Sequence, residues 1–414
     1  MDERRMCMPT GATCRGVIRA VASVAGCLLL VVGTAAQAHA DTTRSQQWHL
    51  DAMHTEEMWR TSTGQGITVA LIDTGVDPDN PDLRGRVLDG KDFATKRRTG
   101  DEHTDYDGHG TGMAGLVVGT GAYGGGNGAF GLAPGAKILP VRMPDADDVS
   151  PFVVSAYFSK GIRYAVDAGA QIINVSMSGG TNTPELSRAV KYALDKGSLI
   201  FAAVGNDADK AREVDYPAAT PGVVGVAAVG RNLRRTPWSQ YGPQVDLSAP
   251  GEDMVHACGG KTGLCKTRGT SDATALASAS AALIWSEHPT WTNNQVLRVL
   301  LNTAGGPTDG SKRNDSIGYG IVRPRIALSN PGAPGPAGEY PLPDLAAAAP
   351  ASSSTTEHAT KGTVTPERGG ESAADASSEG GGHSVLWIAL GVGSALLVAG
   401  VAGAVVGMRR HSAA

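Results

Sequence analysis

The chain has 414 residues, of which 41% are hydrophobic, 18% are charged and 56 are glycine. This composition excludes a collagen, a coiled coil and a wholly disordered chain, and the length allows two or three domains with one large core. The formal net charge of −4 provides no basic field to attract a phosphate backbone, which argues against nucleic acid as a partner.

Residues 1–40 have the three parts of an export signal. Four arginines between residues 4 and 19 precede an apolar run over residues 21–32, and Ala38-His39-Ala40 offers small residues for cleavage. The mature chain is then expected to begin at Asp41, with residues 41–60 as a short N-terminal extension. An uncleaved anchor is the alternative, although the apolar run is shorter than the ~18 residues that a membrane span needs.

Short apolar runs alternate with amphipathic stretches through the middle of the chain. Residues 184–196, for example, place Leu186, Val190 and Leu194 on one face of a helix. Apolar strands separated by such helices are typical of an α/β protein whose mostly parallel sheet is covered on both faces. The predicted strands cover residues 67–72, 138–141, 171–177, 199–204 and 223–229.

Polar residues of the types used in catalysis stand where these elements begin or end. Asp73 and Asn206 follow predicted strands, and His109 and Ser271 begin apolar helical stretches. Each alone is explained by a turn or a helix cap. Together they match acyl-transfer chemistry, in which a serine needs an imidazole base, a carboxylate to orient that base and an amide donor for the oxyanion.

Two cysteines, Cys258 and Cys265, remain after the three in the export signal are removed. An exported chain meets an oxidising compartment, so we expect a disulfide, and further ligands for a zinc site are missing.

Asp77, Asp79 and Asp82 cluster after the first strand as possible calcium ligands, but loop carboxylates are usually solvated. We therefore expect no metal and no other cofactor.

The C-terminal part of the sequence indicates a membrane anchor. Residues 331–382 are rich in Pro, Ala, Ser, Gly and Thr and are expected to form a disordered tether. Residues 383–408 include a stretch over 385–408 without an ionisable side chain, long enough for a transmembrane helix. Two arginines follow, which places the tail over 409–414 in the cytoplasm and the bulk of the chain outside the cell.

Three motifs occur in the order Asp, His, Ser. They are Ala-Leu-Ile-Asp-Thr-Gly-Val-Asp over residues 70–77, Gly-His-Gly-Thr over 108–111 and Gly-Thr-Ser over 269–271. The chain resembles the subtilisin-type serine proteases in these motifs, and the likeness extends over roughly residues 60–325. It implies a three-layer subtilisin-like sandwich over residues 61–330.

The resemblance also implies a role for each site residue. Asp73 would orient His109, His109 would serve as general base and then as acid, and Ser271 would attack the peptide carbonyl. Asn206 and the backbone N–H of Ser271 would bind the oxyanion. An extended polypeptide substrate would pair with a strand segment, which implies endopeptidase activity. That segment comprises Ser176, Met177, Ser178, Gly179 and Gly180.

Four residues depart from the usual pattern of the family. Gly112 and Met113 stand where His and Val are common, Asp272 follows the nucleophile where an apolar residue is commoner, and Ala275 replaces a frequent proline. None of these changes removes a catalytic atom. The carboxylate of Asp272 is expected to raise the pKa of His109.

The succession of export signal, short extension, protease domain, tether, single span and basic tail resembles a mycosin, the membrane-anchored protease associated with type VII secretion in actinobacteria. This resemblance implies a single-pass protein of the cell membrane that works beside a secretion complex. A general cell-surface subtilase without a secretion partner is the first alternative. An inactive scaffold that keeps only the fold is the second, and the complete set of catalytic residue types argues against it.

Overall fold

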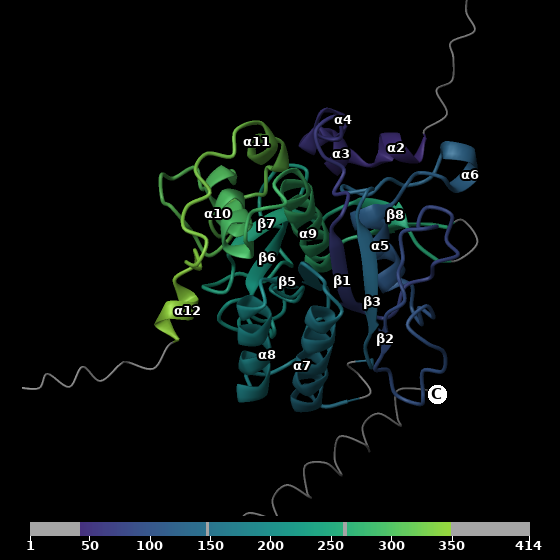
Figure 1. Cartoon of the computed structure of the whole chain (residues 1–414), viewed down its shortest axis with the longest axis horizontal. Helices are drawn as coiled ribbons and strands as arrows, with labels where there is room; N and C mark the ends of the chain where they lie inside the picture. The colour runs from purple at the N-terminus through teal and green to yellow at the C-terminus, as the bar shows by residue number, and fades with distance from the viewer. Residues whose placement is uncertain (1–41, 146–148, 260–262, 349–414) are drawn as a thin grey trace, which may run out of the picture. The chain divides into compact units, whose positions relative to one another are not determined.

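Seven parallel strands form the central sheet, in the spatial order β2–β3–β1–β4–β5–β6–β7 (Figure 1). The computed structural model describes residues 42–145, 149–259 and 263–348. The strands are β1 (Thr68–Asp73), β2 (Lys91–Asp92), β3 (Lys137–Arg142), β4 (Ile172–Val175), β5 (Leu199–Ala203), β6 (Val224–Val229) and β7 (Leu247–Pro250). A separate antiparallel hairpin consists of β8 (Met254–Ala257) and β9 (Leu264–Thr267).

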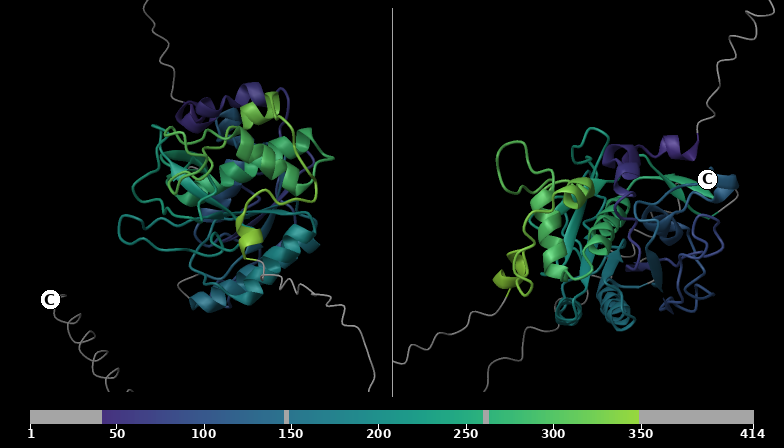
Figure 2. Two further views of the ribbon diagram at one scale, coloured as in Figure 1. Left: turned by 90° about the vertical axis from the view of Figure 1, so that its left-hand side faces the viewer. Right: turned by 45° about the horizontal axis from the view of Figure 1, so that its top comes forward.

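Helices cover both faces of this sheet, so the expected α/β architecture with a mostly parallel sheet is confirmed (Figure 2). Strand β1 shows why: Val69 and Leu71 belong to one buried cluster, whereas Ala70 and Ile72 belong to the other. Successive side chains of a strand point to opposite faces, so an uninterrupted apolar strand needs a cover on each side.

The helices divide between the two faces. Helices α7 and α8 pack beside each other on one face, and α9 lies across β4 to β7 on the other face, where it also contacts α5 and α10. The longer helices are α5 (His109–Val118), α7 (Pro151–Asp167), α8 (Pro184–Asp195), α9 (Thr270–Glu287) and α10 (Asn293–Thr303). The shorter ones are α2 (Thr43–Gln46), α3 (Trp48–Met53), α4 (Thr55–Met58), α6 (Tyr123–Gly126), α11 (Pro324–Ser329) and α12 (Asp344–Ala347).

The five predicted strands correspond to β1, β3, β4, β5 and β6. The strand expected over 171–177 is shorter in the structure, because β4 ends at Val175 and residues 176–180 lie in a loop. The α8 helix begins at Pro184 as expected, after Thr183, whose side chain accepts a hydrogen bond from the backbone N–H of Leu186. Strands β2 and β7 and the β8–β9 hairpin were not predicted from the sequence.

The N-terminal extension folds into α2, α3 and α4 and is hydrogen-bonded to the backbone of the domain that follows it. The indole of Trp59 donates to the carbonyl of Leu132 over 2.9 Å, and the amide of Gln47 donates to the carbonyls of Phe130 and Val255 over 2.8 and 3.0 Å. The extension is therefore an integral part of the folded unit.

One residue of the extension is a buried histidine without a hydrogen-bond partner for either ring nitrogen. His49 in α3 has no exposed surface. Burial, reinforced by the neighbouring His256 and Arg44, lowers the pKa of His49 to about 3. Because the unfolded chain takes up this proton near pH 6.5 and the folded chain does not, stability should fall as the pH drops from 6.5 towards 3.

We therefore expect His49→Leu to stabilise the protein most in acid. The penalty for the wild-type histidine amounts to about 2 kcal/mol at pH 5. Urea unfolding at pH 7.5 and pH 5 measures it, with replacement of the exposed His54 by Asn as the control for loss of a surface histidine. An equal difference between His49→Leu and wild type at both pH values would contradict this account.

The packed part of the chain extends beyond residue 330, so the expected start of the tether at residue 331 was wrong. The guanidinium of Arg298 in α10 donates to the carbonyls of Pro334, Pro336 and Glu339 over 2.8 to 3.1 Å. The Asp344 carboxylate accepts the backbone N–H of Gly222 over 2.7 Å. A Pro- and Gly-rich composition thus does not prevent a segment from packing when a neighbouring helix supplies donors for its carbonyls.

The expected export signal over 1–40 and the expected transmembrane helix over 383–408 lie outside the described residues, as does most of the tether. Among the residues that the structure does describe, no helix combines the length and the apolar character that a bilayer crossing requires.

Candidate active site

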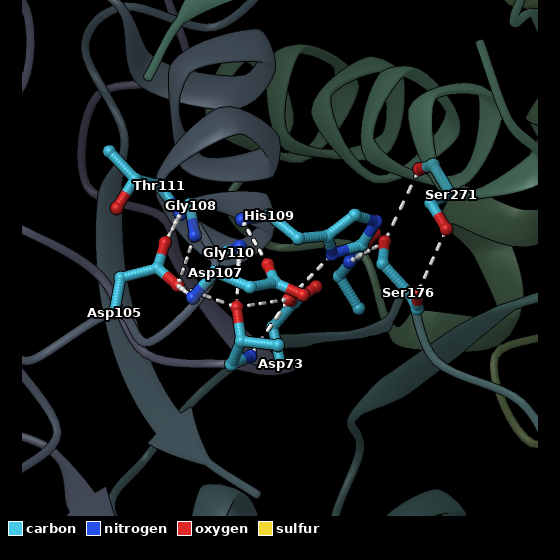
Figure 3. A network of polar contacts seen from close by, with 11 residues as sticks. Asp73, Asp105, Asp107, Gly108, His109, Gly110, Thr111, Ser176 and Ser271 are labelled. Atoms are coloured by element: carbon cyan, nitrogen blue, oxygen red, sulfur yellow. Dashed lines mark hydrogen bonds and ion pairs between the residues drawn. The ribbon is translucent and has the colours of Figure 1, made fainter. Parts of the chain in front are cut away.

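The side chains of Asp73 and His109 meet at the carboxyl end of β1. Asp73 is the last residue of this strand and His109 is the first residue of α5. Nδ1 of His109 lies 2.7 Å from Oδ1 of Asp73, and because a carboxylate can only accept, Nδ1 carries the hydrogen. In Figure 3 the imidazole ring stands between Asp73 and Ser271.

The first turn of α5 is fixed by a network that sequence reasoning missed. Asp105 accepts the hydroxyl of Thr74 over 2.7 Å and the backbone N–H groups of Gly108 and Thr111 over 2.9 and 2.7 Å. Asp107 accepts the backbone N–H of His109 over 2.8 Å. Carboxylates are favoured at helix N-termini, so the acidic residues before Gly-His could have indicated this arrangement.

A glycine allows α5 to approach β1 so closely. A Cβ atom at position 110 would lie 2.0 Å from the carbonyl oxygen of Gly75 and 3.2 Å from Cβ of Asp73. Any side chain at this position would therefore separate Asp73 from His109.

Burial and charge act against each other on this pair. Burial raises the pKa of Asp73, although the neighbouring His109 favours the carboxylate. For His109, burial favours the neutral ring, but the charge of Asp73 and its hydrogen bond outweigh that effect and raise the pKa to about 9, with smaller contributions from Asp272 and Asp107. The carboxylate therefore strongly stabilises the imidazolium that a general base becomes.

Ser271 is the second residue of α9 and is almost fully buried, with 7% of its surface exposed. Its hydroxyl donates to the backbone carbonyl of Ser176 over 2.8 Å. In this arrangement the hydroxyl hydrogen is turned to Ser176, and a rotation about the Cα–Cβ bond is needed to present it to His109.

Asn206 lies in the loop after β5, beside the beginning of α9. Its Oδ1 accepts the backbone N–H and the hydroxyl of Thr270 over 2.8 and 3.0 Å, which turns its NH₂ group away from Thr270. The backbone N–H of Ser271 belongs to the first turn of α9, where helical N–H groups have no intrahelical acceptor. Both donors suit a developing negative charge.

The five residues of the segment over 176–180 are not equally exposed. Ser176 is buried, its hydroxyl accepts from the side-chain amide of Asn174 over 2.7 Å, and its carbonyl binds Ser271. Residues 177–180 are half-buried, so only these retain surface for a substrate.

Cys258 and Cys265 form a disulfide with a Cα–Cα distance of 5.7 Å, which links β9 to the residue after β8.

Asp82 of the acidic cluster is buried, and its two oxygens accept the backbone N–H groups of Tyr123 and Ala129 over 2.7 and 2.8 Å. Within the described ranges, no group of three His, Cys, Asp or Glu side chains is placed to hold a metal ion.

Comparison with known proteins agrees with this geometry. The family model described as the subtilase family, peptidase S8, matches residues 64–320. The chain therefore belongs to the subtilase family of serine proteases. It is 36% identical over 236 residues to the major intracellular serine protease of Bacillus subtilis, covering 56% of this chain and 72% of that protein. It is 33% identical over 260 residues to thermitase of Thermoactinomyces vulgaris, covering 63% and 88%.

Among solved structures, the chain is similar to two mycosins. MycP1 from Mycobacterium smegmatis matches with a TM-score of 0.61 and 27% identity, covering 70% of this chain and 86% of that one. MycP3, described as a protease from the type VII (ESX-3) secretion system, matches with a TM-score of 0.59 and 31% identity, covering 68% and 87%. The resemblance to mycosin-like subtilisins is thereby confirmed.

Proposed function

We propose that this subtilase is a secreted, membrane-anchored endopeptidase whose catalytic triad is Asp73, His109 and Ser271. The observation that carries the triad is the 2.7 Å hydrogen bond between Asp73 and His109, with the imidazole standing between Asp73 and Ser271 (Figure 3).

In the proposed mechanism the Ser271 hydroxyl first leaves the carbonyl of Ser176 and transfers its proton to Nε2 of His109 as its oxygen attacks the substrate carbonyl. Asp73 stabilises the imidazolium through Nδ1–H. The imidazolium then protonates the leaving amine, and an acyl-enzyme ester remains on Ser271. Water, deprotonated by His109, hydrolyses this ester and restores the serine.

The backbone of residues 177–180 is proposed to bind an extended substrate by edge pairing. This mode requires a flexible stretch of polypeptide, since a folded protein has no free backbone to offer. The substrate class is accordingly an unfolded segment or a linker of a larger protein.

The oxyanion is proposed to be bound by the Asn206 side chain and the Ser271 backbone N–H. Asn206→Asp keeps an oxygen for Thr270 and removes the NH₂ donor, so we expect kcat to fall by about 10² to 10³ with little change in KM. Steady-state kinetics on a cleaved peptide measures both constants. A decrease in kcat of less than threefold would remove Asn206 from the oxyanion site.

We further propose an association with a type VII secretion complex in the cell membrane, with the protease domain outside and the C-terminus in the cytoplasm. The likeness to MycP1 and MycP3 and the apolar stretch over 385–408 support it. Purification of the full chain from membranes in mild detergent tests it. Recovery of secretion components supports the association, and recovery of the chain alone favours a general surface protease.

The endopeptidase activity is best tested by profiling a peptide library with the purified protein, with Ser271→Ala as the blank. Cleavage within peptides by the wild type and none by the variant is expected. Release of single terminal residues, or equal cleavage by both proteins, would contradict the proposal.

A further inference from the structure

A second chain of polar side chains lies next to the nucleophile, and the proposed mechanism does not use it. Oδ1 of Asp272, the residue that follows Ser271, is hydrogen-bonded to the hydroxyl of Thr267 over 2.5 Å. The same hydroxyl oxygen lies 2.7 Å from Nε2 of His256. The residues Asp272 and His256 are each only 2% exposed, and Thr267 between them is half-buried.

The β8–β9 hairpin holds this chain together. His256 in β8 pairs with Cys265, and Thr267 is two residues further along β9, on the same face of the hairpin. Nδ1 of His256 lies 2.8 Å from the carbonyl oxygen of Ala257. Because that oxygen can only accept, Nδ1 carries a hydrogen and the orientation of the ring is fixed at both nitrogens.

His256 also packs against the helix that carries His109. A Cβ atom at Gly112, three residues after His109, would lie 2.5 Å from Cε1 of His256. A Cβ at Gly115 would lie 2.9 Å from Cβ of Ala257. The imidazole thus occupies the space that a side chain at position 112 would otherwise take, and two glycines on one face of α5 let β8 approach.

Counting hydrogens explains how a carboxylate can be buried beside the nucleophile. If Asp272 is ionised, Thr267 donates to it and His256 must donate from both nitrogens as an imidazolium. If the proton lies on Asp272, the hydroxyl donates to a neutral His256. Both arrangements have no net charge. Burial raises the pKa of Asp272 and lowers the pKa of His256, and either arrangement leaves the buried pair without net charge.

We propose that His256 is a positioning residue for the triad. Through Thr267 and Asp272 it holds the first turn of α9, which carries Ser271. Through its contact with Gly112 it holds the first turns of α5, which carries His109. It therefore sets the separation between nucleophile and base. This inference rests on the proposed function, since it assigns a role relative to the catalytic pair.

The contribution is expected to be large because the nucleophile and base depend on alignment. A displacement of about 1 Å can reduce the rate of a reaction by about 10². The Ser271 hydroxyl must also rotate from Ser176 to His109, so the accuracy of the final position depends on how rigidly the two helix starts are held.

The sharpest test breaks the link without changing its volume. Thr267→Val removes the shared hydroxyl, and Thr267→Ser keeps it. The readouts are the second-order rate of Ser271 labelling by a fluorophosphonate and, on a cleaved peptide, kcat and KM separately. We expect Thr267→Val to slow labelling about tenfold and to lower kcat with KM unchanged, whereas Thr267→Ser stays within about twofold of wild type.

Thr303→Val is the control, because it also replaces a threonine whose hydroxyl donates within the fold, in this case to the carbonyl of Val299 in α10. A comparable decrease in melting temperature for both valine variants, with slow labelling only for Thr267→Val, separates positioning from general stability. Labelling of Thr267→Val at the wild-type rate overturns the proposal.

The contact of His256 with α5 is tested by making the substitution Gly112→Ala both in the wild-type chain and in the His256→Ala variant. Gly112→Ala should slow labelling about tenfold in the wild-type chain, because its methyl group collides with His256. In the His256→Ala background the same substitution should slow labelling less than twofold, since the space that the imidazole occupied is free. An equal loss of labelling rate in both backgrounds overturns the proposed contact between His256 and α5.

If the folded wild type itself is not labelled, the proposed function fails. If the wild type is labelled and the variants are labelled at the same rate, only the positioning role of His256 fails.

Discussion

Ser271→Ala is expected to lower kcat by about 10⁶ while the protein remains folded. The hydroxyl is the proposed nucleophile, and the neighbouring hydroxyl of Thr270 already donates to Asn206. His109→Ala should cause a similar loss, because a serine without a base is hardly more reactive than water. The double variant should be no worse than either single one, since the two residues act as a unit.

Steady-state cleavage of a peptide found in the library screen measures these losses, and circular dichroism verifies folding. Ser280→Ala provides the control, because Ser280 is a buried serine of the same helix whose hydroxyl donates to the carbonyl of Leu276. Activity in Ser271→Ala above about 1% of wild type, or losses that multiply in the double variant, would contradict the triad.

Asp73→Asn is expected to lower kcat by about 10⁴. The carboxylate accepts Nδ1–H of His109 and so leaves Nε2 free to take the serine proton. An asparagine can donate its amide hydrogen to Nδ1 instead, which leaves the hydrogen of the neutral ring on Nε2 and blocks it as a base. The geometry barely changes, so KM should remain close to that of the wild type.

The same substitution should shift the pH dependence. Burial favours neutral His109, but the charge and hydrogen bond of Asp73 raise its pKa to about 9. Activity requires the neutral base, so kcat/KM of the wild type should rise with pH through this pKa, and removal of the carboxylate should move the rise to lower pH. The pH profile of kcat/KM tests the shift, with the exposed Asp79→Asn as control. A rise at the same pH in both proteins would show that Asp73 does not govern His109.

The sheet could be predicted where its strands are long and apolar. β1, β5 and β6 are buried on both faces and therefore appear as uninterrupted hydrophobic runs. β7 consists of Leu-Ser-Ala-Pro and β2 of Lys-Asp, and neither has a pattern that separates it from a loop. Their place in the sheet is decided by neighbouring strands, which a local pattern does not contain.

The residues of the candidate site also divide into those that a local sequence pattern indicates and those that it does not. Asp73 and His109 lie in motifs whose residue types already describe acid–base chemistry, and the structure brings them together. His256 stands in an ordinary short strand, so its link to Asp272 depends on a hairpin register that no local pattern shows. The tether boundary failed for a related reason: composition records the prolines and glycines over 331–348 but not the guanidinium of Arg298 that binds their carbonyls.

The most direct test of the account is covalent labelling of the folded wild-type protein with a fluorophosphonate, followed by mass spectrometry of its peptides. Ser271 alone should carry the phosphonyl group, and labelling should disappear in His109→Ala and after heat unfolding. A folded protein that stays unlabelled, or one that is labelled at another residue, would contradict the assignment of Ser271 as a nucleophile activated by His109.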